Sequence, residues 1–218
     1  MQRSLTTLFA LMLFTIMGLS AAYAQTAPFS FGLEGSLSRG TGDFGDAVEL
    51  GQQFGVVLER QVSPTTAIGF SLGRHGWDAN SDFNYALSVV LSSLIDPTFD
   101  PFLDPPLVDA SARYEATEYT GHVRLFMANE SSGMRPYLEG GIGGYSMKVK
   151  VALAGIGEED ESYNLLGINL GGGVDFPVGT NTTLAIGAKY HYIASEDDLG
   201  ANTTALALGA RLSFGFGR

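Results

Sequence analysis

The sequence predicts an all-β protein, an eight-stranded antiparallel up-and-down transmembrane β-barrel. Three observations support this fold class: apolar side chains alternate with small or charged ones along successive segments, short connections alternate with long ones, and 29 glycines accompany only 16% charged residues. Beyond the N-terminus no apolar stretch is long enough for a membrane-spanning helix, so strands must provide any spanning segments. Closing these strands into a barrel pairs every backbone group that lipid would leave unsatisfied.

The N-terminus has the features of a secretory signal peptide. A basic residue, Arg3, precedes an apolar run over residues 5–19, and Ala22-Tyr23-Ala24 offers a small-x-small cleavage site. We expect residues 1–24 to be removed as a signal peptide and residues 25–218 to form one outer-membrane β-barrel domain. An uncleaved membrane anchor is the alternative.

Alternation with a period of two marks the strands. Seven segments place apolar side chains on one face and Gly, Ala, Ser or isolated charges on the other; their apolar faces begin at Phe29, Leu50, Ile68, Val123, Leu166, Leu184 and Leu206. The remaining strand, residues 135–151, is less regular. Its second half alternates Tyr145, Met147 and Val149 with polar residues, whereas Glu139 falls in the apolar register unless a bulge near Gly140 shifts it.

A soluble β-sandwich would also alternate, so the polar face decides between the two folds. In a sandwich that face meets water and is rich in Lys, Glu and Thr. Here it is mostly small, and small residues are what a narrow closed barrel needs inside. The apolar face is therefore expected to contact lipid.

The connections support the same topology, because outer-membrane barrels have short periplasmic turns and longer external loops. The predicted short connections are 62–65, 129–133 and 177–181. The predicted long ones are 38–48, 74–112, 152–162 and 194–202. This arrangement joins eight strands, leaves both termini in the periplasm and puts the long loops outside a bacterial cell.

Two glycine-rich segments and the aromatic C-terminal strand carry a resemblance to a known family. Residues 135–145 (Arg-Pro-Tyr-Leu-Glu-Gly-Gly-Ile-Gly-Gly-Tyr) and residues 171–176 (Gly-Gly-Gly-Val-Asp-Phe) resemble small outer-membrane barrels of the OmpA/OmpX type, in the broad "outer membrane protein β-barrel domain" group. The resemblance extends from about Phe29 to Phe216. It implies an eight-stranded barrel with a plugged lumen.

Charged residues on the inward faces predict what fills that lumen. Charges in a dry interior are tolerated only when they are paired. We therefore expect a plugged barrel crossed by an ion-pair network of Glu34, Glu59, His122, Arg124, Asp175, Lys189, His191 and Arg211. The alternative is a small pore in which Lys189 and Arg211 line an ion path.

The second long connection, residues 74–112, is apolar and about 39 residues long, and loops of that size are usually functional or disordered. Residues 84–95 are expected to form a short helix. This helix either packs on the barrel rim as a lid or presents an interaction surface made of Tyr85, Leu87, Val90, Leu91 and Leu94. In the pore alternative, the same loop gates a conduit for ions or hydrophobic solutes.

Charge is concentrated in the predicted outer loops, which hold 16 of the 23 acidic residues of a chain with net charge −11. Nucleic acid is consequently a poor partner. The expected partners are outer-membrane lipid and lipopolysaccharide, and an extracellular protein or a cationic partner that binds the acidic loops. The chain is expected to be a monomer. The acidic loops also fit a simpler role in keeping the exposed surface soluble.

The sequence predicts no enzyme, cofactor or metal site. The chain has no cysteine, which excludes thiol catalysis and disulfides, and no local metal-ligand spacing or phosphate-binding motif is present. His191 with Ser195 and Glu196 superficially resembles a lipid hydrolase, the most distant alternative, but nothing fixes the serine or supplies an oxyanion hole. A structural or surface-interaction role is the primary prediction.

Overall fold

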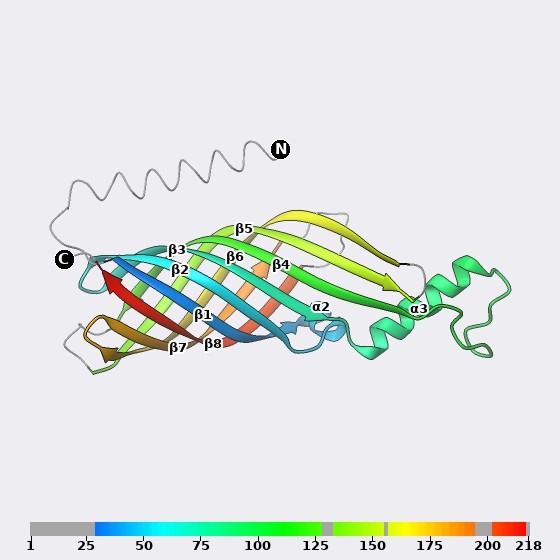
Figure 1. Cartoon of the computed structure of the whole chain (residues 1–218), viewed down its shortest axis with the longest axis horizontal. Coiled ribbons are helices and arrows are strands. Elements are labelled where there is room, and N and C mark those ends of the chain that lie inside the picture. Colours follow the sequence, from blue (N-terminus) through cyan, green and yellow to red (C-terminus); the bar gives the residue numbers. More distant parts are fainter. Residues whose placement is uncertain (1–28, 128–132, 155–156, 195–201, 217–218) are drawn as a thin grey trace.

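The computed structural model describes residues 29–127, 133–154, 157–194 and 202–216. Its eight antiparallel strands form one closed barrel in which every strand pairs with its neighbours in sequence and β1 pairs with β8 (Figure 1). The strands are β1 (Phe29–Thr41), β2 (Gly51–Ser63), β3 (Thr66–Asp78), β4 (Ala110–Phe126), β5 (Arg135–Leu153), β6 (Gly157–Gly179), β7 (Thr182–Ile193) and β8 (Thr203–Phe216). The predicted fold class is confirmed.

The two ends of the barrel differ. At one end, here called the turn end, β1 begins and β8 finishes, with Phe29 opposite Phe216, and a tight turn at 64–65 joins β2 to β3. The opposite end, the loop end, carries two helices, α2 (Gly42–Ala47) and α3 (Ser81–Ile95), and α3 projects beyond the barrel (Figure 1). None of the described helices is long and apolar enough to cross a membrane. The expected signal peptide lies outside the described residues.

Alternation along the strands sorts side chains as expected on seven of them. Outward residues such as Leu33, Ile168 and Leu208 are at least half exposed on the barrel surface, because no other described residue covers them. In the middle of the barrel, inward residues are mostly small, or they are charged and buried, such as Glu59 and Arg211. The apolar surface therefore lies outside and the polar one inside, the reverse of a soluble protein.

Strand β5, whose alternation is irregular, does not have the register that the sequence predicted. It pairs with β4 and β6 without any shift, so there is no bulge at Gly140. Glu139 points inward and is buried, as are Tyr145 and Met147, whereas the Lys148 side chain is 37% exposed on the outer wall. The expectation that Tyr145 and Met147 face outward was wrong, because near the loop end the apolar side chains fill the interior and the polar ones form the wall.

Three of the long connections are also shorter than predicted. Since β3 extends to Asp78 and β4 begins at Ala110, the second long connection is 79–109 rather than 74–112. The third is 154–156 rather than 152–162, because β5 and β6 continue as a paired ribbon past the rest of the wall. The first is 42–50 rather than 38–48, and it contains α2, which no pattern in the sequence had indicated.

Helix α3 is three residues longer at its start than the predicted helix of 84–95. Asn80 precedes it with an extended backbone, and its side-chain oxygen accepts a hydrogen bond from the Phe83 amide at 2.9 Å. Such an N-cap satisfies one of the amides that a helix start leaves free. The cap therefore sets the beginning of the helix at Ser81.

Close packing of strands around the narrow lumen makes one glycine of β5 a test of the barrel. A Cβ on Gly143 would overlap the Tyr119 carbonyl oxygen and lie 2.6 Å from Thr120 Cα, whereas a Cβ on Gly140 of the same strand would meet nothing closer than 3.8 Å. We expect Gly143→Ala to destabilise the barrel by about 1–3 kcal/mol. Guanidinium unfolding in detergent, with Gly140→Ala as the matched control, measures this. Equal midpoints for the two variants would contradict the described packing.

Candidate functional site

The lumen contains a connected set of ion pairs centred on two arginines, here called the lumen network: Glu34, Glu59, His122, Arg124, Glu139, Asp175, Lys189 and Arg211. Arg211 on β8 is 5% exposed and reaches three carboxylates. Its Nη1 lies 2.8 Å from Glu59 Oε1, and its Nη2 lies 3.0 Å from Glu34 Oε2 and 3.2 Å from Glu139 Oε2. One guanidinium thus joins β8 to β1, β2 and β5 across the barrel.

Arg124 on β4 makes a second centre of the lumen network. Its guanidinium nitrogens lie 3.2 Å from Glu139 Oε2, 3.3 Å from Asp175 Oδ2 and 3.4 Å from Glu59 Oε1. Its Cζ also lies 4.1 Å from the centre of the Tyr137 ring, a cation–π contact. Glu59 and Glu139 are therefore each shared by both arginines.

The two remaining bases of the network each meet one of the shared carboxylates. Lys189 Nζ lies 3.0 Å from Glu139 Oε1, and His122 Nε2 lies 3.0 Å from Glu59 Oε1. The structure thus brings together seven of the eight residues that the sequence proposed for the lumen. Sequence reasoning missed Glu139 because the residue falls in the apolar register of its strand, the face expected to contact lipid unless a bulge near Gly140 shifted it.

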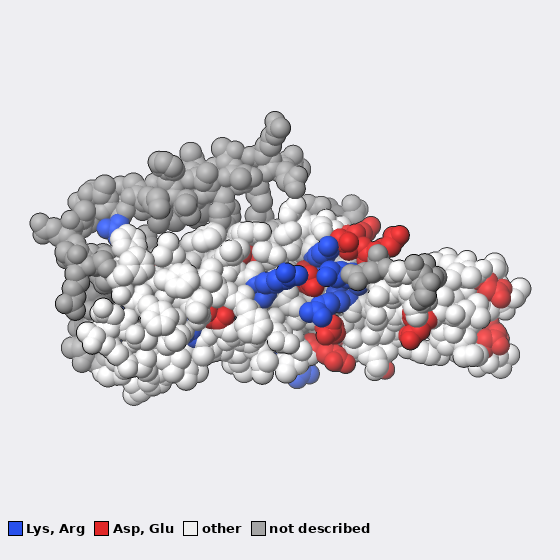
Figure 2. Space-filling model, in the orientation of Figure 1, with Lys and Arg blue, Asp and Glu red and all other residues white. Residues whose placement is uncertain are grey.

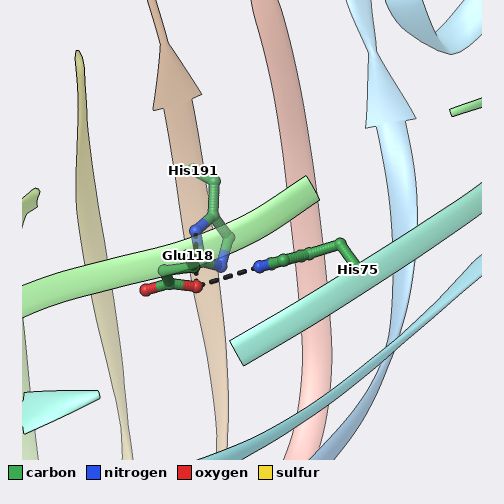
Figure 3. Close-up of side chains that lie close together, drawn as sticks. All are labelled: His75, Glu118 and His191. Carbon is green, nitrogen blue, oxygen red and sulfur yellow. Dashed lines mark hydrogen bonds and ion pairs between the residues drawn. The ribbon is translucent and has the colours of Figure 1, made fainter. Parts of the chain in front are cut away.

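The eighth predicted residue, His191, belongs to a separate group nearer the loop end, here called the His–Glu cluster: His75, Glu118 and His191 (Figure 3). Glu118 is completely buried. Its Oε2 lies 2.9 Å from His75 Nε2 and 3.8 Å from His191 Nδ1, while Thr120 donates a 2.7 Å hydrogen bond to its Oε1. Inward alternation continued further along β3 and β4 would have identified both His75 and Glu118.

Beyond the His–Glu cluster, the loop end is filled by an apolar layer, here called the apolar cap. Phe44 from α2 packs edge-on against Trp77, with ring centres 5.4 Å apart. The buried members of the layer are Phe44, Val48, Trp77, Ala116, Tyr145, Met147, Leu165, Ile193 and Ala205. The sequence did not reveal this layer, because it predicted neither α2 nor the inward direction of Tyr145.

A pocket of about 290 Å³ lies at the loop end beside Phe44, Met147 and Leu165, and the described lumen also has open space at the turn end. A cavity of about 630 Å³ lies there, lined by residues that include Phe29, Arg124, Phe126 and Asp175. A separate pocket of about 50 Å³ lies next to Lys189 and Glu34, within the network. The lumen beside these two residues therefore holds much less open space than the turn end does.

Helix α3 presents a different kind of surface. Its Ser88 and Ser92 are buried, and their hydroxyl oxygens accept hydrogen bonds from the Ala110 and Leu107 amides at 2.9 and 2.8 Å. Among the residues predicted as an interaction surface, Leu87 and Leu91 are half-buried. The exposed ones are Tyr85, Val90 and Leu94, at 55%, 54% and 74%. The serine side of the helix thus packs against residues 107–110, and an apolar side faces away.

Charged residues line the outer wall near the loop end, beyond a largely uncharged barrel surface (Figure 2). Arg74 and Lys150 approach Glu115 at 2.7 and 3.1 Å, and Lys148 approaches Asp160 at 2.7 Å. In the loop after α3, hydrogen bonds from the Thr98 hydroxyl and amide hold the pKa of Asp96 below its ordinary value. That carboxylate therefore keeps its negative charge at lower pH than an isolated one.

A closed antiparallel barrel with an apolar wall and a polar interior defines a small transmembrane β-barrel protein. The profile of the outer membrane protein beta-barrel domain matches residues 7–214, and the chain belongs to this family of the bacterial outer membrane. No curated protein matches the chain in sequence. The predicted resemblance is thereby confirmed.

Solved structures show the same fold. Neisserial surface protein A is similar with a TM-score of 0.55 and 15% identity, over 86% of this chain and 97% of that one. Ail, the attachment invasion locus protein of Yersinia pestis, solved in complex with the heparin analogue sucrose octasulfate, gives 0.52 and 17%, over 87% and 100%. A major outer membrane protein from Thermus thermophilus gives 0.52 and 13%, over 86% and 99%.

Removing Arg211 tests the energetic role of the lumen network. We expect Arg211→Met to destabilise the barrel by about 3–5 kcal/mol, because it leaves Glu34, Glu59 and Glu139 buried with fewer counter-charges. Arg74→Met breaks an ion pair on the outer wall and should cost about 1 kcal/mol or less. Denaturant unfolding in detergent compares the two variants. An Arg211→Met barrel as stable as the Arg74→Met barrel would show that the network contributes little.

Proposed function

We propose that this protein is an integral outer-membrane β-barrel whose lumen is plugged, and that it has a structural or surface-interaction role rather than a transport role. The observation that carries this proposal is the lumen network: Arg211 contacts carboxylates from three other strands, so its side chain crosses the interior. In an eight-stranded barrel there is room only for packed side chains. An ion would have to break several buried ion pairs to pass.

Two further layers support a closed lumen. The His–Glu cluster lies between the network and the loop end, and the apolar cap closes that end with Phe44 and Trp77. An apolar constriction opposes the passage of hydrated ions even where some space remains. Hydrogen bonds to Ser88 and Ser92 hold helix α3 against residues 107–110. The exposed side of the helix offers apolar contacts to another molecule.

The partner at the loop end is proposed to be a protein surface with apolar and cationic groups. Tyr85, Val90 and Leu94 supply the apolar contacts, and Asp82 and Asp96 on or next to α3 contribute negative charge. The net charge of −11 disfavours a polyanion such as nucleic acid. On the outer wall below, Arg74 and Lys150 are at a position suited to lipopolysaccharide headgroups, although both also contact Glu115.

The orientation in the membrane is part of the proposal: the signal peptide 1–24 is cleaved, the turn end faces the periplasm and the loop end faces the outside. Since the chain has no cysteine, a single introduced cysteine shows on which side of the membrane its residue lies. Ser93→Cys in α3 should react with a membrane-impermeant maleimide in intact cells, whereas Thr180→Cys in the β6–β7 turn should react only after disruption. The mass of the extracted protein should correspond to residues 25–218. Reversed labelling would overturn this topology.

Single-channel recording in a planar bilayer tests the closed lumen. We expect the refolded protein to insert without stable conductance steps, because the lumen network and the apolar cap block the path along the barrel. A variant in which a short Gly-Ser linker replaces residues 81–106 should remain silent as well, since that segment lies outside the barrel.

Insertion must be verified independently, by the altered gel mobility of unheated protein. Stable steps from the intact protein would favour the pore. Steps that occur only in the variant without residues 81–106 would identify that segment as a gate. Either outcome contradicts the plugged barrel.

A further inference from the structure

We propose that the His–Glu cluster of His75, Glu118 and His191 binds a divalent transition-metal ion of the Zn²⁺ type inside the barrel. Each residue offers one ligand atom, and these atoms all lie within 4.8 Å of one another. The atoms that approach Glu118 Oε2 are His75 Nε2 and His191 Nδ1. The side chains come from β3, β4 and β7 and converge on one point (Figure 3). Two imidazoles and a carboxylate are a ligand set that suits zinc.

The spacing between the ligand atoms is compatible with one ion. Zinc lies about 2.0–2.2 Å from nitrogen and oxygen ligands, so tetrahedral ligands are about 3.3–3.6 Å apart. The distances from Glu118 Oε2 to the two imidazoles, 2.9 and 3.8 Å, fall on either side of that range. The Tyr145 hydroxyl, 3.1 Å from His191 Nδ1, offers a further oxygen next to the site. Small side-chain movements would therefore complete the coordination.

Charge gives an independent reason for a cation at this position. Glu118 is completely buried, and among the described residues its ion-pair partners are only the two histidines. Lys189, two residues from His191 on the same inward face, acts on Glu118 only from a longer distance, because its ammonium lies 3.0 Å from Glu139. A buried carboxylate without a permanently charged group in close contact is unfavourable. A divalent ion next to Glu118 removes this penalty.

The same imbalance extends through the lumen. The lumen network and the His–Glu cluster together contain five carboxylates, Glu34, Glu59, Glu118, Glu139 and Asp175, but three permanently charged bases, Arg124, Lys189 and Arg211. Arg135 stacks on Phe126 at the turn end and also interacts electrostatically with Asp175. A divalent ion next to Glu118 would offset the remaining excess of negative charge.

The far ring nitrogens of the two histidines, His75 Nδ1 and His191 Nε2, are buried and have no hydrogen-bond partner among the described residues. They point away from Glu118, so an ion at the site would be bound by the other nitrogen of each ring. The His75 ring is instead held by stacking on Trp77, with centres 5.4 Å apart, which leaves its Nε2 directed at the site.

A second group with similar ligands provides a built-in control. Glu59, His122 and Glu139 are also close enough to share an ion. However, Arg211 and Arg124 lie within 3.4 Å of both carboxylates, and their positive charges would repel a cation there. We therefore expect metal at Glu118 and none at Glu59.

Metal analysis of the refolded protein tests the proposal. Because the apolar cap closes the loop end, Zn²⁺ is added to the denatured protein before it is refolded into detergent, and unbound ion is removed by dialysis. We expect about one Zn²⁺ per chain in the wild type and in His122→Gln, and less than about one tenth in His75→Gln and Glu118→Gln. Refolding with Co²⁺ should give the visible absorption of a four-coordinate ion with nitrogen and oxygen ligands.

Gel mobility of unheated samples verifies that each variant has folded. A folded wild-type protein that retains no metal would overturn the proposal, whether or not the variants fold. Loss of metal from His122→Gln to the same extent as from His75→Gln would also overturn it, since binding would then not be specific to the His–Glu cluster. The bilayer recording is a separate measurement, so the metal site and the closed lumen can fail independently.

Discussion

A charge can be buried inside so narrow a barrel only where it meets an opposite charge, and this constraint organises the whole interior. It acts directly on strand register. Glu34 on β1 stands opposite Arg211 on β8 at the seam that closes the barrel, and Arg124 on β4 stands opposite Glu139 on β5. A slip of one residue at either place would turn these charges into the apolar wall. The ion pairs therefore help to specify which residues face each other around the barrel.

The solvent changes along the barrel, and the distribution of residues reverses with it. Near the turn end and in the middle, apolar side chains such as Leu138 and Ile142 of β5 face outward and Glu139 faces inward. Toward the loop end of the same strand, Lys148 is on the wall and Tyr145 is inside. Lipid favours an apolar wall, whereas water beyond the membrane favours a charged one and leaves the interior to the aromatic residues. One strand thus contains two opposite patterns in a single continuous register.

Local patterns were sufficient for much of this description. The inward placement of Glu34, Arg124, Lys189 and Arg211 follows from alternation alone, because a strand sends successive side chains to opposite faces. Alternation could not place Glu139 or Tyr145 on the correct face, since the glycines of a glycine-rich strand do not indicate which of its faces points outward. It also could not separate His191 from the lumen network, because height along the barrel depends on the stagger between strands that are distant in sequence.

The sequence by itself determined the number of strands, their order, the apolar wall and the need to pair buried charges, because each of these follows from the alternation and spacing of residues along the chain. Only the tertiary structure decided which charges meet. Closure of the barrel brings Arg211 to Glu59, 152 positions apart in the chain, and brings His75, Glu118 and His191 together from three strands. Such contacts depend on register and stagger around the whole barrel, which no single strand encodes.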